Sequence, residues 1–211
     1  SIDWNDLQTV LLLMLGVFSL ILFVIYELSI ENPLLDLKVL KIFPFSLSIL
    51  ISSTLSMALI GGVYIIPLYL QNLKGYTAMQ TGMILFPSAL ATGIMMPISG
   101  KLFDKIGAKP LVIPGIGLLA FVTYELSKVN IDTSPHTVTW LLVARGIALG
   151  LAMMPSTTAG MNEVPLPLVA RASALSNTIR QVAGALSITI ITIFMQNRQN
   201  VNYARLAEQV S

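Results

Sequence analysis

Cysteine is absent from this 211-residue chain, and histidine occurs once, at His136. Without cysteine there are no disulfides, thiolate metal sites or cysteine nucleophiles, and one histidine argues against a histidine-based metal cluster. Charged residues are scarce, at 10% of the chain, whereas soluble domains hold about 25%. The 12 basic and 10 acidic residues nearly balance, and no basic run alternates with aromatics, so nothing indicates a nucleic-acid partner.

Signatures of catalysis are also missing. The chain contains neither an HExxH zinc motif nor a GxSxG nucleophile motif. No acidic residue falls in the middle of a long apolar stretch, where a membrane-embedded enzyme would need one. We therefore predict no catalytic residue, no metal and no cofactor.

Apolar residues fill the chain instead, at 55% of its length, with a mean hydropathy of +0.81. A soluble core could not bury that much apolar surface. Six stretches approach the roughly 20 residues that a membrane-spanning helix needs: residues 7–26, 45–70, 81–99, 111–126, 138–160 and 170–194. The predicted fold is an all-α membrane protein with six transmembrane helices.

The basic residues of the links set the expected orientation. The links at 27–43, 100–110 and 161–171 hold six lysines and arginines, against four in the opposite links. Because basic loops stay on the cytoplasmic side, we expect these three links to face the cytoplasm. The predicted location is the cell membrane, crossed several times.

Glycine and proline interrupt four of the predicted spans. The breaks are Gly61, Gly62, Pro67, Pro87, Gly93, Pro97, Pro114, Gly115, Gly117, Gly146, Gly150 and Pro155. Small residues let helices approach closely, and Gly146-x3-Gly150 has the small-xxx-small spacing. Packing alone would explain any single break. Together, the breaks favour a mobile bundle that lines a cavity over a static anchor.

Two arginines, Arg145 and Arg180, fall about 12–15 Å deep along the fifth and sixth predicted spans, at roughly 1.5 Å per residue. An arginine at mid-membrane costs about 2.5–3.5 kcal/mol on insertion scales, so it normally faces a cavity or a partner. Structural pairing and snorkelling are the alternatives. Arg180 also belongs to a polar stripe with helical spacing, which we expect to face the central cavity: Ser173, Ser176, Asn177, Arg180, Gln181, Gly184 and Ser187.

Softer candidates complete the predicted site. Met57, Tyr64, Met153 and Met154 suit an adaptable wall for varied apolar ligands, although such residues are commonly core packing. Glu125 and Glu163 are the carboxylates nearest a proton path, at opposite ends of the predicted bundle. Each also fits an interfacial position or an ion pair.

The link at 100–110 carries the strongest local pattern, in which Asp104 stands among three lysines and between two glycines. Gly100 can end a helix, and Gly107 can adopt a positive φ. A carboxylate so placed can pair with a lysine or a helix N-terminus in one conformation and release it in another. The plainer alternative is a solvated, basic loop.

This run resembles the major facilitator motif G-x-L-x-D-[RK]-x-G-[RK]-[RK], which locks the inner gate of those transporters. The resemblance implies a gating role for Gly100, Asp104, Lys105, Gly107 and Lys109. Ala108 departs from the motif, where the family usually has a basic residue.

Further runs resemble one branch of that superfamily, the fourteen-helix drug:proton antiporters. They are residues 31–37, residues 66–71 followed by Gly75-Tyr76, Arg145-Gly146 with Gly150 and Pro155, and residues 172–181. The resemblance implies a helix between the two transporter halves at 1–27, a cytoplasmic link at 28–44, the first five helices of the C-terminal six-helix domain at 45–196, and an extracellular loop or tail at 197–211.

By the same resemblance, the function is proton-coupled export of amphipathic or cationic drugs by alternating access. The implied partners are drug-like molecules, protons, membrane lipid and a missing N-terminal half of the same transporter. Another facilitator, such as a nutrient uniporter or symporter, is the nearest alternative. A membrane-embedded scaffold or enzyme is more remote.

Overall fold

A computed structural model describes residues 7–29 and 37–210, and every regular element in these residues is a helix. The helices are α1 (Leu7–Ser29), α2 (Phe43–Asn72), α3 (Ala78–Ile106), α4 (Lys109–Ser127), α5 (Pro135–Asn162) and α6 (Val169–Val210), with short 3-10 turns η1 (Leu37–Lys41) and η2 (Leu166–Leu168). Six helices of this described part are long and apolar enough to cross a membrane. The predicted fold class is confirmed, and each span begins within a turn of its expected start.

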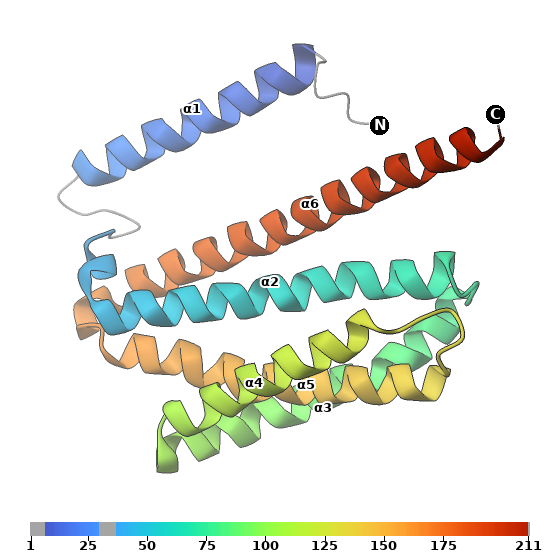
Figure 1. Ribbon diagram of the computed structural model, residues 1–211. Coiled ribbons are helices and arrows are strands. Elements are labelled where there is room, and N and C mark those ends of the chain that lie inside the picture. The colour runs from blue at the N-terminus through green and yellow to red at the C-terminus, as the bar shows by residue number, and fades with distance from the viewer. Residues whose placement is uncertain (1–6, 30–36, 211) are drawn as a thin grey trace.

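The bundle is organised around α5. This helix packs against α2, α3 and α4, and α6 packs along the other side of α2. Figure 1 shows these five helices side by side, with α1 lying apart from them. Most of α1 is exposed apolar surface. A membrane protein can leave such surface bare, because lipid tails are as apolar as the side chains.

Short connections hold the neighbouring helices antiparallel. Between α2 and α3, Gly75 takes a φ of 70°, and Thr77 caps α3 in a reciprocal capping box with Gln80. Between α4 and α5, the side chain of Ser134 caps α5 just before Pro135. The sequence thus encodes its turns with the residues that helix ends prefer.

Small residues create a close seam between α3 and α5. Three hydroxyls of α3 donate to carbonyls of α5: Ser88 to Leu142 at 2.7 Å, Thr92 to Gly146 at 3.1 Å and Ser99 to Gly150 at 2.8 Å. A Cβ on Gly150 would lie 2.7 Å from that of Met95. The Gly146-x3-Gly150 pair is therefore a helix-packing site, as its spacing predicted.

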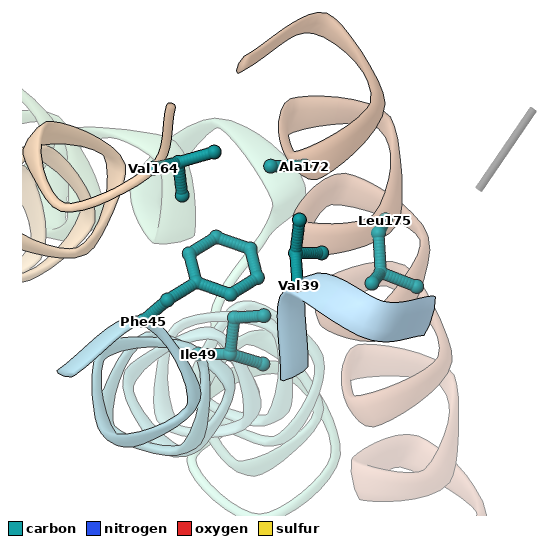
Figure 2. Close-up of a cluster of buried hydrophobic side chains, with 6 residues drawn as sticks. All are labelled: Val39, Phe45, Ile49, Val164, Ala172 and Leu175. Carbon is teal, nitrogen blue, oxygen red and sulfur yellow. The ribbon is translucent and has the colours of Figure 1, made fainter. Parts of the chain in front are cut away.

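A hydrophobic cluster fastens the segment before α2 to the expected cytoplasmic end of the bundle. Figure 2 shows its members, drawn from η1, α2, the link after α5, and α6: Val39, Phe45, Ile49, Val164, Ala172 and Leu175. The link predicted at 28–44 thus ends in a packed turn. Its family-like run at 31–37 lies outside the described residues except for Leu37.

Two helices extend beyond the ends expected for their spans. Gly100 does not end the third span, because α3 continues to Ile106 and ends at Gly107. The loop or tail expected from 197 is helical as far as Val210. Neither residues 101–106 nor residues 197–210 contain a glycine or proline that would break the helix. Polar residues such as Lys, Arg, Gln and Glu are good helix formers, so they continue a helix as readily as apolar ones.

Candidate functional site

Two neighbouring cavities lie along α2, a continuous helix that contains the glycine pair Gly61-Gly62 and Pro67. Cavity 1 has a volume of about 550 Å³ and lies between α2, α4, α5 and α6. Cavity 2 has a volume of about 440 Å³ and lies between α2, α3 and α5. Apolar side chains form most of both walls, which suits small organic ligands.

Arg145 lines both cavities and is 8% exposed. Its Nη2 donates a hydrogen bond to the backbone carbonyl of Ala58 on α2. The guanidinium lies against Gly62, where a Cβ would collide with it. The sequence predicted a buried arginine beside a cavity, and the structure adds the glycine of another helix that makes room for it.

Arg145 is the charged side chain among the described residues that line the two cavities. Among the described residues, no aspartate or glutamate lines either cavity. In this same part of the chain Arg145 has a backbone carbonyl and no carboxylate as its partner. The structural pairing considered from the sequence is therefore with a helix backbone.

Arg180 is placed differently. Its Nη1 donates to the Thr157 hydroxyl at 3.3 Å, and its Nη2 donates to the side-chain oxygen of Asn177. The Ser56 hydroxyl donates to the backbone carbonyl of Arg180 at 3.3 Å. These contacts tie α6 to α5 and α2, and they place Arg180 and Asn177 outside the linings of both cavities.

The polar stripe of α6 serves mainly as a packing surface against α2. The Ser187 hydroxyl donates to the Met57 carbonyl at 2.9 Å and lies where a Cβ on Gly61 would be. Gly184 makes room for Ile60. Ser187 lines cavity 1, whereas Gln181 is exposed and lines neither cavity. The expectation that the stripe faces the central cavity stays a prediction, and the contacts of Ser187 and Gly184 show that small polar residues also let helices approach.

The predicted adaptable wall is only partly assembled. Met57 lines cavity 1, but Tyr64 is exposed and lines neither cavity. Met153 packs against a buried cluster of α2, α4 and α5 side chains, and Met154 lies near Gly100 on α3.

Sequence reasoning missed Tyr69, Thr123 and Ser127, which supply hydroxyls to the lining of cavity 1. The Tyr69 hydroxyl also donates to the Asn130 carbonyl at 2.9 Å, and Lys74 donates to the Thr133 carbonyl, so the end of α2 is tied to the α4–α5 loop. Tyr69 could have been found, because it lies one helical turn after Ile65 and two turns after Gly62, on the same face of α2.

A family comparison decides what kind of protein carries these cavities. A sequence-family model described as the Major Facilitator Superfamily matches residues 7–188, which is most of the chain. The chain belongs to the major facilitator superfamily. It is therefore an integral membrane protein from a family of transporters and not of enzymes.

Relatives within the superfamily come from bacteria. The chain is 39% identical over 212 residues to the uncharacterized MFS-type transporter YhcA of Bacillus subtilis, covering 100% of this chain and 40% of the relative. It is 32% identical to the lincomycin resistance protein LmrB of Listeria innocua (98% and 44% covered). It is 28% identical to the multidrug export protein EmrB of Escherichia coli (100% and 42% covered). The chain thus spans less than half the length of these relatives.

The facilitator motif occupies the turn between α3 and α4. Gly107 ends α3 with a φ of 80°, and its N–H donates to the Phe103 carbonyl at 2.8 Å. Its positive φ was predicted and is confirmed. Asp104 and Lys105 lie in the last turn of α3, and Lys109 begins α4. In the described part of this facilitator chain Asp104 forms no ion pair with either lysine, so the gating contact stays a prediction.

Neither proton-path candidate lines a cavity, although Glu125 lies directly before Leu126 of the cavity 1 wall. Glu125, in the last turn of α4, pairs with Lys128 at 2.7 Å, and Lys128 also lies 4.1 Å from the centre of the Tyr124 ring. Glu163 follows the end of α5 and is exposed. The two carboxylates are at opposite ends of the bundle, as predicted.

Proposed function

We propose that this chain forms part of a transporter that exports small amphipathic or cationic drugs in exchange for protons, by alternating access in the cell membrane. The observation that carries the proposal is the pair of apolar cavities between helices that contain glycine and proline, with a buried arginine in their common wall. Relatives named for multidrug export and lincomycin resistance support a drug-like substrate.

We further propose that α2–α6 correspond to the first five helices of the C-terminal six-helix domain, with α1 between the two halves. The family-like runs support this assignment, because they occur in the family's order from the α2–α3 turn to α6. In this assignment the N-terminal half of the same transporter covers the cavity-bearing side of the bundle. The complete substrate path then needs both halves.

Alternating access requires helices that can change their shape beside the substrate. Pro67 has no N–H to donate to the Val63 carbonyl one turn earlier, and Val63 lines cavity 2. Gly61 and Gly62 add a flexible point in the same wall. These features support α2 as a bending element whose movement changes both cavities, with the Asp104 turn as the inner gate.

Proton exchange needs a titratable group on the transport path. Since no carboxylate of the described residues lines either cavity, we expect the main proton-carrying group in the half that pairs with this chain. Glu125 and Glu163 remain the weaker candidates here, from the ends of α4 and α5.

The test is dye efflux from vesicles that contain the full-length transporter. We expect lipophilic dyes to be expelled and the rate to fall when the pH gradient is collapsed. Efflux that ignores the gradient would remove the proton coupling and favour a uniporter. Failure to expel any of a panel of lipophilic anions and cations, from protein shown to be folded, would remove the drug-export function.

A further inference from the structure

The electrostatics of the cavities point to a particular charge on the ligand. Arg145 is charged at any physiological pH, and it lies in the common wall of cavities 1 and 2. In α2–α5 and their connections, the acidic residues lie at the helix ends: Asp104 and Glu163 at one end of the bundle, Glu125 and Asp132 at the other. A cation in these cavities would meet a positive charge and, from the described residues, no counter-charge.

Most of the hydrogen-bonding capacity of Arg145 is unused. A guanidinium carries five N–H donors in a planar fork. One of them, on Nη2, reaches the Ala58 carbonyl, and the described residues supply no acceptor for the others. At 8% exposure the group is largely removed from water. A buried arginine with unfilled donors attracts an acidic group strongly, because bidentate pairing satisfies two donors and the charge together.

The rest of cavity 1 fits the apolar body of such a ligand. Met57, Ile65, Leu126 and Ile191 form an apolar surface around a volume of about 550 Å³, which lies in the range of sites for drug-sized molecules. Thr123 and Ser127 add hydroxyls on the α4 side. One end of the ligand site is therefore charged and the remainder is apolar, which matches an amphipathic molecule.

We propose that cavity 1 binds amphipathic organic anions, with their carboxylate or similar acidic group on the Arg145 guanidinium. This assigns to the site a charge preference opposite to the cationic drugs included in the proposed function. It rests on the proposed function only in taking the ligand to be the transported substrate. A purely structural arginine, which clamps α5 to α2 through Ala58, would give no preference between anions and cations.

The test uses two fluorescent ligands that share one apolar body. Dansylglycine carries a carboxylate, and dansyl-ethylenediamine carries an ammonium. Binding of each is measured by fluorescence to the full-length transporter in lipid nanodiscs. We expect dansylglycine to bind at least about tenfold more tightly, since hydrogen bonds to charged groups contribute enough for that factor.

Two variants remove the guanidinium from its position by different routes. Arg145→Gln deletes the charge. Gly62→Ala keeps it, but the new Cβ collides with the guanidinium, which is the movable end of a side chain. In both variants, the ratio of the affinity for dansylglycine to the affinity for dansyl-ethylenediamine should fall about tenfold. Gly93→Ala is the matched control, since Gly93 also lines cavity 2 and its Cβ would meet nothing within 4 Å. Arg198→Gln, at an exposed position of α6, controls for the loss of one positive charge.

Equal binding of the two ligands by the unaltered protein would overturn the proposal. A preference that survives both Arg145→Gln and Gly62→Ala would also overturn it. If Arg145→Gln fails to fold, Gly62→Ala decides. Efflux of both ligands is measured in parallel. An intact preference without efflux contradicts the export function and keeps the site, whereas efflux without any preference keeps export and removes the site.

Discussion

The two faces of α5 are built differently, although Arg145 and Gly146 are neighbours in the sequence. Towards α3, Gly146 and Gly150 bring the backbones together, and hydroxyls of α3 bond the α5 carbonyls. Towards α2, Arg145 holds the helices with a long side chain between two cavities. One face is closed by backbone contact, and the other is spanned by a side chain that can move.

This difference indicates where the bundle is rigid and where it can respond to a ligand. A Cβ on Gly146 would collide with the Ser88 carbonyl, which is backbone. For a Cβ on Gly62, the three nearest atoms all belong to the guanidinium at the end of Arg145. Packed backbone transmits strain, whereas a rotamer change costs little. We therefore expect α3 and α5 to move as one body, and α2 to move relative to them.

The largest effect on stability is expected for Gly146→Ala. The new methyl group overlaps Ser88 backbone and Thr92, and overpacking of this kind costs about 1–3 kcal/mol. The measurement is unfolding of the full-length protein by detergent titration in mixed micelles. The matched control is Gly117→Ala on α4, because a Cβ there would meet nothing within 4 Å. Equal stability of the two variants would contradict the distinction between the two faces.

The close contact on the face of α5 towards α3, which we call the rigid face, could be predicted from the sequence. Glycine and serine at helical spacing predict close approach whatever the partner helix is, because the information is local. For the same reason the six spans and the turn at Gly107 could be predicted. The exact helix ends at Ile106 and Val210 could not, since polar residues continue a helix as well as they end it.

The face of α5 towards α2 was harder to predict. The depth of Arg145 and Arg180 along their helices is similar, and sequence periodicity favoured Arg180 as the cavity residue because of its polar stripe. The fold separates them, because Ala58 and Gly62 of α2 meet Arg145, while Thr157 and Asn177 meet Arg180. Which residues meet across helices depends on long-range packing, and a single sequence does not encode that visibly.

The Arg180→Ala variant tests the side-chain contact between α6 and α5. Loss of the Arg180 side chain removes the bonds to Thr157 and Asn177, yet Asn177 is exposed and Arg180 is partly exposed, so we expect near-normal expression. We expect transport to fall several-fold, because α6 loses its side-chain tie to α5 and hydrogen bonds to charged groups are worth about 1.5–3 kcal/mol. Efflux is measured per amount of folded protein. Unchanged efflux would remove Arg180 from the transport path, and lost expression would make it a structural residue.

The smallest effect is expected for Ser99→Ala, within the rigid face itself. Ser99 is fully buried, and its hydroxyl donates to Gly150 at 2.8 Å across the α3–α5 seam. Hydrogen bonds between membrane helices contribute about 0.6 kcal/mol on average, because the unfolded chain in the membrane also finds partners. Ser29→Ala is the matched control, since within the described residues the Ser29 hydroxyl donates to the Ile25 carbonyl of its own helix and not to another helix. In the same detergent titration, Ser99→Ala should lose slightly more stability than Ser29→Ala. A loss as large as that of Gly146→Ala would mean that the hydroxyl bonds, and not the close backbones, hold α3 against α5.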